Sequence, residues 1–311
     1  MKCQLILNPK SNSGRAAGRF ERIFALLQQA GVEYHCAYAQ TYDSIREASI
    51  KANETGYDAV VAVGGDGTIN AVMNGFYNED GTTRSDKRMG VIYTGTSPDF
   101  CMSYGIPLDL AKAVDVISTG KTRNIRVGRI ELRLSPDRDG TITKYFSCCA
   151  SIGIGAMVAG KANRYRKYLG DTGGTLLAIL SSLARFRARD MQLASSSGEL
   201  IFPKVTNIFV GRTRFIASGL KVSCEIEDDD DRFYILCIHD LGFLRLPGLL
   251  RQLYSGNTKT SAVMEVMNSA DININTGKEI IPVEFDGDPA GFTPCSIRPA
   301  HSPLRLIVGN G

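Results

Sequence analysis

The segment 59–70, with the sequence AVVAVGGDGTIN, constrains the fold of this chain more than any other. Its first five residues are apolar and mostly β-branched, which is typical of a buried strand. Three glycines around Asp66 then interrupt the strand, and Thr68 is a residue type that often caps a helix. Apolar residues at helical spacing follow at Ile69, Val72, Met73 and Phe76. This order of strand, glycine turn and helix start points free backbone N–H groups towards an anion.

The glycines of this turn also matter for what can approach it. Because Gly64, Gly65 and Gly67 have no Cβ atom, a phosphate can come close to the main chain. The plainer interpretation is an ordinary tight turn between a strand and a helix, and the turn alone leaves both interpretations open.

Composition narrows the class of protein. A length of 311 residues indicates about two domains, and 43% hydrophobic with 22% charged residues is typical of a globular protein with a substantial core. The net charge of +4 is too small to indicate a nucleic acid partner. Eight cysteines without paired spacing and three scattered histidines give no zinc motif. No segment approaches the roughly 20 apolar residues that span a bilayer, so we expect a cytoplasmic protein.

Strands and helices alternate through the first 122 residues. We expect strands at 3–7, 32–39, 59–63 and 89–93, and helices from Phe20, from Ser44 (a capping box with Glu47), from Ile69 and over 108–117. This alternation predicts an α/β domain with a mostly parallel sheet over residues 1–122. A last strand at 304–308, within the segment 300–311, can return to either domain.

Three polar loops that contain glycine, at 8–14, 64–68 and 94–99, each follow a predicted strand. Ligands of such sheets bind outside the carboxyl ends of the strands. We therefore expect the three loops to meet at one rim and to form a shared site.

After residue 122 the pattern changes to short strands separated by turns. Two helical insertions are expected, at 156–189 and 244–254. The predicted strands cover 126–134, 141–149, 205–210, 220–226, 233–238, 263–267, 271–275 and 280–285. Residues 123–299 should therefore form a β-rich domain of the sandwich or barrel type.

Several common phosphate-binding and catalytic motifs are absent. The glycine turn is not followed by the Lys-Ser/Thr of a Walker loop, and it does not fit the dinucleotide pattern Gly-x-Gly-x-x-Gly. The chain also has neither a protein-kinase signature nor a Gly-x-Ser-x-Gly element.

An ordered set of motifs nevertheless spans almost the whole chain. It consists of Asn8-Pro9-x-Ser11, Gly64 to Thr68 with Asn74-Gly75, Gly95-Thr96-x-x-Asp99-Phe100, Ser151-Ile152-Gly153, an Asp-rich turn before a strand at 230–235, and Asp286-Gly287-Asp288. This set resembles the diacylglycerol kinase catalytic domain and the bacterial soluble lipid kinases, which share a superfamily with sphingosine, ceramide and NAD kinases. The resemblance implies an N-terminal nucleotide-binding domain and a β-rich, sandwich-like lipid-substrate domain. It also implies ATP- and Mg²⁺-dependent transfer of the γ-phosphate to a hydroxyl of diacylglycerol or a related lipid.

The resemblance assigns nucleotide contacts to this sequence. Backbone amides and small hydroxyls can hold phosphate oxygens without a lysine. Asp66 would repel a phosphate, so we expect it to bind Mg²⁺ or to brace the turn; the alternative is a carboxylate that caps the helix. The implied contacts are Asn8, Pro9, Lys10, Ser11, Asn12, Thr41, Gly64, Gly65, Asp66, Gly67, Thr68, Ile69, Asn70 and Thr96.

Asp286 and Asp288 are the catalytic residues that the resemblance implies. One would take the proton of the acceptor hydroxyl and the other would orient it or a metal ion; the alternative is that Asp-Gly is only a hairpin turn. Asp288, Ala71, Pro98 and Asn12 stand where the family usually has Glu, Glu, Asn and Gly. Ala71, Pro98 and Asp288 leave open a nucleotide-binding regulator with little turnover. A further alternative is an NAD-kinase-like activity on a soluble acceptor, against which the missing dinucleotide motif and the apolar helices argue.

A structural Mg²⁺ site of the bacterial relatives maps to the acidic turn. The resemblance implies the Asp230 carboxylate and the main-chain carbonyls of Glu227 and Arg232 as ligands, although Asp231 replaces the usual glycine. The alternative is a solvated acidic loop.

Two apolar segments with basic flanks suit an anionic membrane surface. One runs from Leu176 to Leu183 and is followed by Arg185, Arg187 and Arg189; the other runs from Leu244 to Leu253. The alternative is that both helices cover the core of the β-rich domain. We expect a lipid substrate presented at a membrane surface, with the protein at the inner membrane face, and a homodimer is left open.

Overall fold

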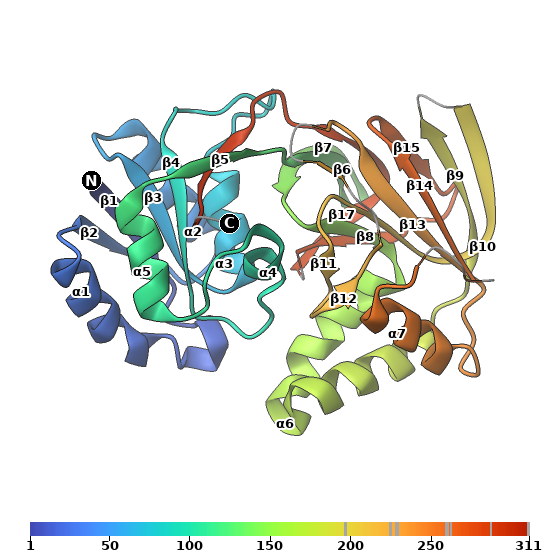
Figure 1. Cartoon of the computed structure of the whole chain (residues 1–311). Coiled ribbons are helices and arrows are strands. Elements are labelled where there is room, and N and C mark those ends of the chain that lie inside the picture. Colours follow the sequence, from blue (N-terminus) through green and yellow to red (C-terminus); the bar gives the residue numbers. More distant parts are fainter. Residues whose placement is uncertain are drawn as a thin grey trace. The chain divides into compact units, whose positions relative to one another are not determined.

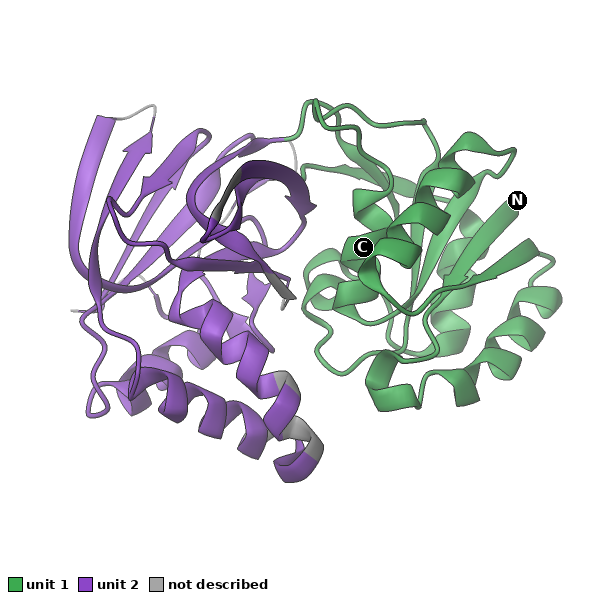
Figure 2. Ribbon diagram, turned by 180° about the vertical axis from the view of Figure 1, so that it is seen from behind, with its two compact units in different colours: residues 1–127, 300–311 green, residues 128–299 purple. Residues whose placement is uncertain are grey.

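The computed structural model describes the chain except for residues 196–197, 224–225, 228–229, 259–260, 262, 287 and 310–311. The side chains at 138–139, 163, 166–167, 171–172 and 288–289 are also outside the description. The chain divides into two units, Met1–Val127 with Ala300–Gly311, and Gly128–Pro299 (Figure 2). The first unit extends past residue 122 because the strand at Thr122–Ile125 pairs with the strand at Leu304–Ile307 inside it.

The first unit is built on one sheet with the strand order β2-β1-β3-β4-β18-β5. All neighbouring strands are parallel except β18 and β5. Since β2 and β3 lie on opposite sides of β1, the chain reverses its direction of travel across the sheet between β1 and β3. The strands are β1 (Lys2–Leu7), β2 (Glu33–Tyr38), β3 (Ala59–Gly64), β4 (Arg88–Tyr93), β5 (Thr122–Ile125) and β18 (Leu304–Ile307).

Helices cover both faces of this sheet (Figure 1). Helices α1 and α5 pack on one face, where Phe20, Ile23 and Ile117 join Leu5 and other strand residues in the core. Helices α2 and α3 pack together on the other face. Every residue of β3 is buried, which is why this strand reads as an unbroken apolar run. The helices are α1 (Phe20–Gln29), α2 (Tyr42–Glu54), α3 (Asp66–Asn74), α4 (Asp99–Tyr104) and α5 (Leu110–Thr119), preceded by the short 3₁₀ turns η1 (Ser11–Gly14) and η2 (Ala17–Arg19).

Two helix starts differ from the prediction. The N-cap of α2 is Thr41 and not Ser44: the Thr41 hydroxyl accepts a hydrogen bond from Ser44 N (3.2 Å), and the Ser44 hydroxyl accepts one from Thr41 N (3.1 Å). The N-cap of α3 is Gly65, and Thr68 lies inside the first turn. In both cases a polar residue three positions after the observed N-cap also has a side chain of the capping type, and local sequence does not decide between the two positions.

The second unit is built on a ten-stranded sheet with the order β14-β13-β10-β8-β16-β17-β15-β9, to which β6 and β7 add through β17. Because β10 also pairs with β9, the path from β10 through β8, β16, β17, β15 and β9 closes on itself. An apolar core that includes Phe146, Ile152, Ile208 and Val283 is built from these strands. The strands are β6 (Gly128–Ser135), β7 (Arg138–Phe146), β8 (Cys149–Gly153), β9 (Arg189–Ser195), β10 (Gly198–Gly211), β13 (Phe233–His239), β14 (Met264–Ser269), β15 (Ile272–Asn275), β16 (Pro282–Phe285) and β17 (Asp288–Pro299), with a small pair β11 (Phe215–Ile216) and β12 (Leu220–Lys221).

Helices α6 (Ile154–Leu183) and α7 (Leu246–Ser255) lie together at one end of this unit (Figure 1). The backbone of α6 leaves the helical conformation at Gly170, where φ is +69°, so α6 consists of two helical segments. In the part of the chain that the structure describes, no helix has the length and apolar character needed to cross a membrane. The predicted insertion ended at residue 189, but the structure ends the helix at Leu183 and starts β9 at Arg189.

Candidate functional site

The three polar loops after β1, β3 and β4 meet at one rim of the first unit, as the strand order requires. Asn8 N donates to Val63 O (3.1 Å), and Thr94 N donates to Gly64 O (2.8 Å). The Asn8 side-chain amide donates to the Thr68 hydroxyl (2.9 Å) and so joins the first loop to the second. This rim lies where the chain reverses across the sheet, which is the usual ligand position in open α/β sheets.

The main chains of the second and third loops approach each other closely. A Cβ atom on Gly95 would lie 2.5 Å from Gly65 Cα, and one on Gly64 would lie 2.4 Å from Thr68 Cβ. A Cβ atom on Gly65 would lie 3.2 Å from Gly95 Cα and 3.4 Å from the Ser11 hydroxyl. Gly65 and Gly95 are therefore required by the contact between the two loops, and Gly64 by the approach of Thr68 within its own loop, in addition to leaving the main chain accessible.

Helix α3 starts at this rim without a side-chain cap, because its N-cap is Gly65. The first amide groups of an α-helix have no acceptor within the helix, and the helix dipole adds a partial positive charge there. Asp66 lies in the first turn, where a carboxylate is favourable. The arrangement can bind an anion through main-chain amides.

The first loop contains an unusual backbone segment. Asn12 and Ser13 have φ values of +52° and +54°. Asn is one of the few residues that tolerate this left-handed conformation, which accounts for Asn12 at a position where the family usually has Gly. Lys10 is exposed, and Pro9 and Ser11 are half-buried in the same loop.

The structure does not bring every expected nucleotide residue to the rim contacts. The Thr41 side chain is used in capping α2. Asn70 is 2% exposed, and its side-chain oxygen accepts from Tyr42 OH (3.2 Å) and Asn74 Nδ2 (3.0 Å), so it holds α2 and α3 together. Ile69 is 1% exposed, whereas Thr96 is exposed in the loop after β4.

Asp66 influences two buried groups beside the rim. Burial, and next to it the Asp66 charge, raise the pKa of the Cys101 thiol, and the same two causes raise the pKa of Tyr93. Both groups therefore stay neutral at physiological pH. Among the described residues, no three or more His, Cys, Asp or Glu side chains are grouped as a metal site. Mg²⁺ is commonly bound by one or two carboxylates together with substrate phosphates, so the donors present fit an ion that arrives with a nucleotide.

In the second unit, Asp286 is anchored at the turn after β16. One carboxylate oxygen accepts from Cys148 N (3.1 Å) and Cys149 N (3.4 Å), and the other accepts from Ser147 N (3.3 Å). Asp286 N in turn donates to Cys149 O (3.2 Å), and the residue has a φ of +50°. Three successive amides, from the end of β7 to the first residue of β8, thus hold this carboxylate. Asp288 is the first residue of β17, and its side chain and Gly287 are outside the described residues.

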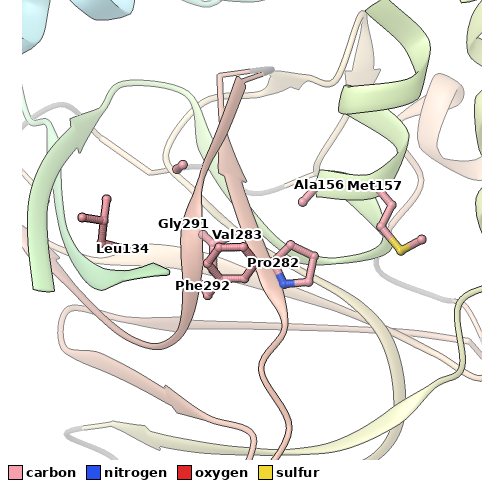
Figure 3. A pocket seen from close by; sticks show the side chains of 8 residues that line it. Leu134, Ala156, Met157, Pro282, Val283, Gly291 and Phe292 are labelled. Carbon is pink, nitrogen blue, oxygen red and sulfur yellow. The ribbon is translucent and has the colours of Figure 1, made fainter. Parts of the chain in front are cut away.

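The hairpin of β16 and β17 also borders an apolar cavity of about 370 Å³ (Figure 3). Val283 and Phe292 line it from the two strands, and Met157 lines it from the start of α6. The remaining lining residues are Leu134, Ala156, Pro282, Ala290 and Gly291. The cavity belongs to the same hairpin whose turn carries Asp286.

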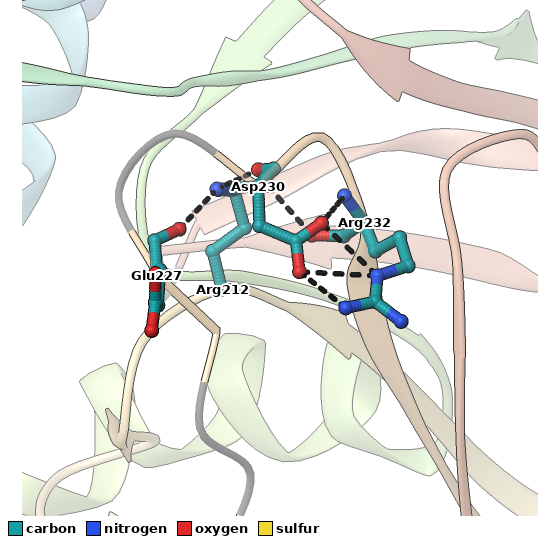
Figure 4. Close-up of polar contacts among 4 residues, drawn as sticks. All are labelled: Arg212, Glu227, Asp230 and Arg232. Atoms are coloured by element: carbon teal, nitrogen blue, oxygen red, sulfur yellow. Dashed lines mark hydrogen bonds and ion pairs between the residues drawn. The ribbon is translucent and has the colours of Figure 1, made fainter.

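The donors expected to hold a structural Mg²⁺ do not fit one (Figure 4). The carbonyls of Glu227 and Arg232 accept hydrogen bonds from the Arg212 guanidinium, at 3.2 Å and 2.6 Å. The Asp230 carboxylate is bound by Arg232, whose Nη2 lies 2.7 Å from Oδ2, and this hydrogen bonding lowers the pKa of Asp230. Arg212 is a binding residue for which the sequence offers little sign, apart from its being a cation directly after a strand whose last residues are apolar.

Both units of the chain are similar to domains of known proteins. A family model described as the diacylglycerol kinase catalytic domain matches residues 2–130, and one described as the YegS C-terminal NAD kinase beta sandwich-like domain matches residues 148–308. A diacylglycerol kinase of Mycobacterium tuberculosis is 27% identical over 98% of this chain and 94% of its own length. One of Staphylococcus aureus is 25% identical over 99% and 93%.

Solved structures agree in fold. A putative diacylglycerol kinase of Bacillus anthracis superimposes with a TM-score of 0.75 at 18% identity, covering 99% of this chain and 97% of that one. Yeast NADH kinase complexed with NADH gives a TM-score of 0.56 at 12% identity, covering 100% and 84%. The two matched domains cover most of the chain, in the order in which the two units occur. The chain therefore belongs to the diacylglycerol kinase family of phosphotransferases.

Proposed function

We propose that this protein is an ATP- and Mg²⁺-dependent lipid kinase that transfers the γ-phosphate to a hydroxyl of diacylglycerol or a related lipid. The observation that carries the proposal is the rim of the first unit, where three loops and the uncapped start of α3 meet. Main-chain amides at Gly65 to Thr68 would bind phosphate oxygens, and the glycines allow the close approach that this requires. The names of the curated relatives support the lipid acceptor.

Asp66 is the carboxylate that would accompany Mg²⁺ at this rim. A bound Mg²⁺ would neutralise charge on the transferred phosphoryl group. Asn8 and Thr68 hold the first two loops in one arrangement through their hydrogen bond, so the proposed phosphate site would be in place before the nucleotide arrives. Such preorganisation reduces the free energy spent on ordering the loops during binding.

The two acids of the second unit would have different roles. Both oxygens of Asp286 accept main-chain hydrogen bonds, so this residue would hold the turn in place. Asp288 would accept the proton of the acceptor hydroxyl. Asp288 is one methylene shorter than the Glu usual in the family, and Asp286 would compensate by fixing the turn that carries it.

The apolar cavity beside the same hairpin would receive an acyl chain of the acceptor. Val283 lies three residues before Asp286, a distance of about 10 Å along a strand, so a chain in the cavity would place a polar headgroup near the turn. The exposed leucines of the helical end, with Leu177 at 41% and Leu244 at 99% exposure, would contact the membrane surface. Arg245, the N-cap of α7, and Arg251 within α7 would favour anionic lipid there.

A second candidate is transfer to NAD, which is favoured by the structural likeness to yeast NADH kinase. A third is a nucleotide-binding regulator, suggested by the departures at Ala71, Pro98 and Asp288.

A single assay separates the three candidate functions: the purified protein is incubated with γ-labelled ATP, Mg²⁺, a panel of micellar lipids, and NAD. Label in diacylglycerol supports the proposal, and label in NAD alone or ATP binding without transfer would reject it.

A further inference from the structure

Arg212 is a buried cation that follows β10, with 8% of its surface exposed. Its guanidinium donates to three main-chain carbonyls of one loop, those of Glu227 (3.2 Å), Arg232 (2.6 Å) and Asp230. A guanidinium carries five N–H donors in one plane, so it can bind several converging carbonyls at once. Figure 4 shows this arrangement.

Carbonyl oxygens that converge beside a carboxylate are the ligands of a hard divalent cation. Here each of these oxygens already has a cationic partner. The Asp230 carboxylate accepts from Arg232 Nε (3.0 and 3.1 Å), Nη2 (2.7 Å) and N (2.8 Å), while the carbonyls contact Arg212. Two arginines together supply the two positive charges that one Mg²⁺ ion would bring.

We propose that Arg212, with Arg232, takes the place of a divalent cation at Glu227, Asp230 and Arg232, so that these three residues are held in place by the protein's own side chains. The position of Arg212 is fixed independently of the loop. Its guanidinium lies over the Phe233 ring at 5.4 Å, and its main-chain N–H donates to Cys148 O (3.1 Å). The Arg212 guanidinium is thus held by the aromatic ring, and the Arg212 main chain is held by its own hydrogen bond. Both contacts suit Arg212 to act as a fixed cation.

The same contacts connect the loop to the turn at Asp286. Cys148 accepts from Arg212 through its carbonyl and donates to the Asp286 carboxylate through its amide (3.1 Å). Arg212 thus links the carbonyls of Glu227, Asp230 and Arg232 to Asp286 through Cys148. The order of this region is then independent of the concentration of divalent cations.

The first test uses thermal unfolding, measured by circular dichroism without nucleotide or lipid, in EDTA and in millimolar Mg²⁺. We expect the wild-type Tm to be the same in EDTA and in Mg²⁺. The difference in Tm between the two conditions should also be the same in Asp230→Asn as in the wild type. An increase in Tm that persists in Asp230→Asn comes from an ion bound elsewhere and agrees with the proposal. A Mg²⁺-dependent increase that disappears in Asp230→Asn would overturn it.

The second test removes the cation. Arg212→Ala leaves three partly buried carbonyls without their donor, and we expect the Tm in EDTA to fall by roughly 2–12 °C. Arg214→Ala is the matched control, since Arg214 is two residues away and exposed, and it should leave the Tm unchanged. If Arg212→Ala does not fold, Arg212→Lys keeps the charge without the planar fork and should give a smaller fall. A wild-type Tm in either variant would contradict the proposal. None of these measurements uses ATP or a lipid, so their result is separate from that of the kinase assay.

Discussion

Asp286 and Asp288 lie two residues apart but should respond differently to substitution. Asp286→Ala removes the acceptor of three main-chain amides, so we expect a lower free energy of unfolding, by about 1–3 kcal/mol, as well as lower turnover. Asp288→Ala should lower kcat by about 10²–10⁴ while the stability stays unchanged. Urea unfolding and label transfer measure the two effects.

The exposed acid Asp137 provides the control for both variants, because it lies in a turn of the same unit. Asp137→Ala should change neither the free energy of unfolding nor kcat. Full activity in Asp288→Ala would remove this residue from the role of proton acceptor.

Gly65 is the position where a single side chain should affect nucleotide binding most directly. Gly65→Val places methyl groups against Gly95 and Ser11 and covers the main chain, so we expect ATP affinity to fall by at least about tenfold. Gly18→Val is the control, since a Cβ atom on Gly18 meets no atom within 4 Å. Calorimetric titration with ATP checks both; unchanged affinity in Gly65→Val would mean that phosphates bind elsewhere.

Residue-level features were predictable where the signal is local. The glycines and polar residues at 8–14, 64–68 and 94–99 follow apolar strands, and strand order alone brings them together. The roles of Thr41 and Asn70 depend on which neighbours they meet after folding, such as Tyr42 and Asn74, and the sequence does not contain that information. Arg212 is 15 to 20 residues from its partners Glu227, Asp230 and Arg232, so no local pattern connects them.

The departure at Ala71 also has a structural context. Ala71 is fully buried in α3, in a helix whose residues from Thr68 to Asn74 are all buried. A glutamate at this position would bury a carboxylate, which is costly unless a partner is supplied. The small residue therefore suits the packing of this chain.

Among the elements, the strands that the sequence did not predict are β5, β8, β9, β11 and β17. The segment of β17 contains Pro289, Gly291 and Pro294, which interrupt the alternation expected of a strand. Its register with β16 is shifted between Val283 and Glu284, and tertiary pairing with β6 and β15 stabilises it instead. Closure of the sheet through β10 and β9 depends on contacts between segments that no local rule connects.

The cavity between the β16–β17 hairpin and α6 gives a prediction at the level of elements. Met157→Trp fills the space from the α6 side, so kcat/KM for long-chain diacylglycerol should fall by about tenfold, and short-chain diacylglycerol should be affected less. Leu200→Trp, on the exposed side of β10, is the control and should leave both values unchanged. An equal loss for the two chain lengths would exclude the cavity as the acyl site.

For the whole molecule, sequence patterns predicted an α/β unit and a β-rich unit. They did not decide which of the two units the last strand joins. The strand at Leu304–Ile307 pairs with β4 and β5, so the chain returns to the first unit after completing the second. A short apolar strand is compatible with either sheet, and only the available strand edge decides. The loops of the first unit and the acids of the second carry the phosphotransfer proposal jointly.

Buried thiols predict how stability depends on pH. Burial raises the pKa of Cys3 to about 11 and those of Cys237 and Cys295 to about 12, from an ordinary value of 9.0. The unfolded chain therefore releases these protons at lower pH than the folded chain does. The contribution of these buried neutral thiols to the free energy of unfolding is fully present below pH 9.0. It is lost as the pH rises from there towards about 12.

Urea unfolding at a series of alkaline pH values measures this loss. Tyr and Lys side chains also titrate in this range, so Cys237→Ala provides the comparison. The variant should show a weaker decline in the free energy of unfolding with pH than the wild type. Parallel curves for the two proteins would show that Cys237 does not contribute.

The central claim is that main-chain amides after β3, together with the loops after β1 and β4, bind the nucleotide phosphates. A crystal structure with Mg²⁺ and a non-hydrolysable ATP analogue tests it most directly. We predict the phosphate oxygens within hydrogen-bond distance of the amides at 65–68, with the loop at 8–14 alongside. Phosphates bound at any other place, with the 64–68 turn facing only solvent, would contradict the account.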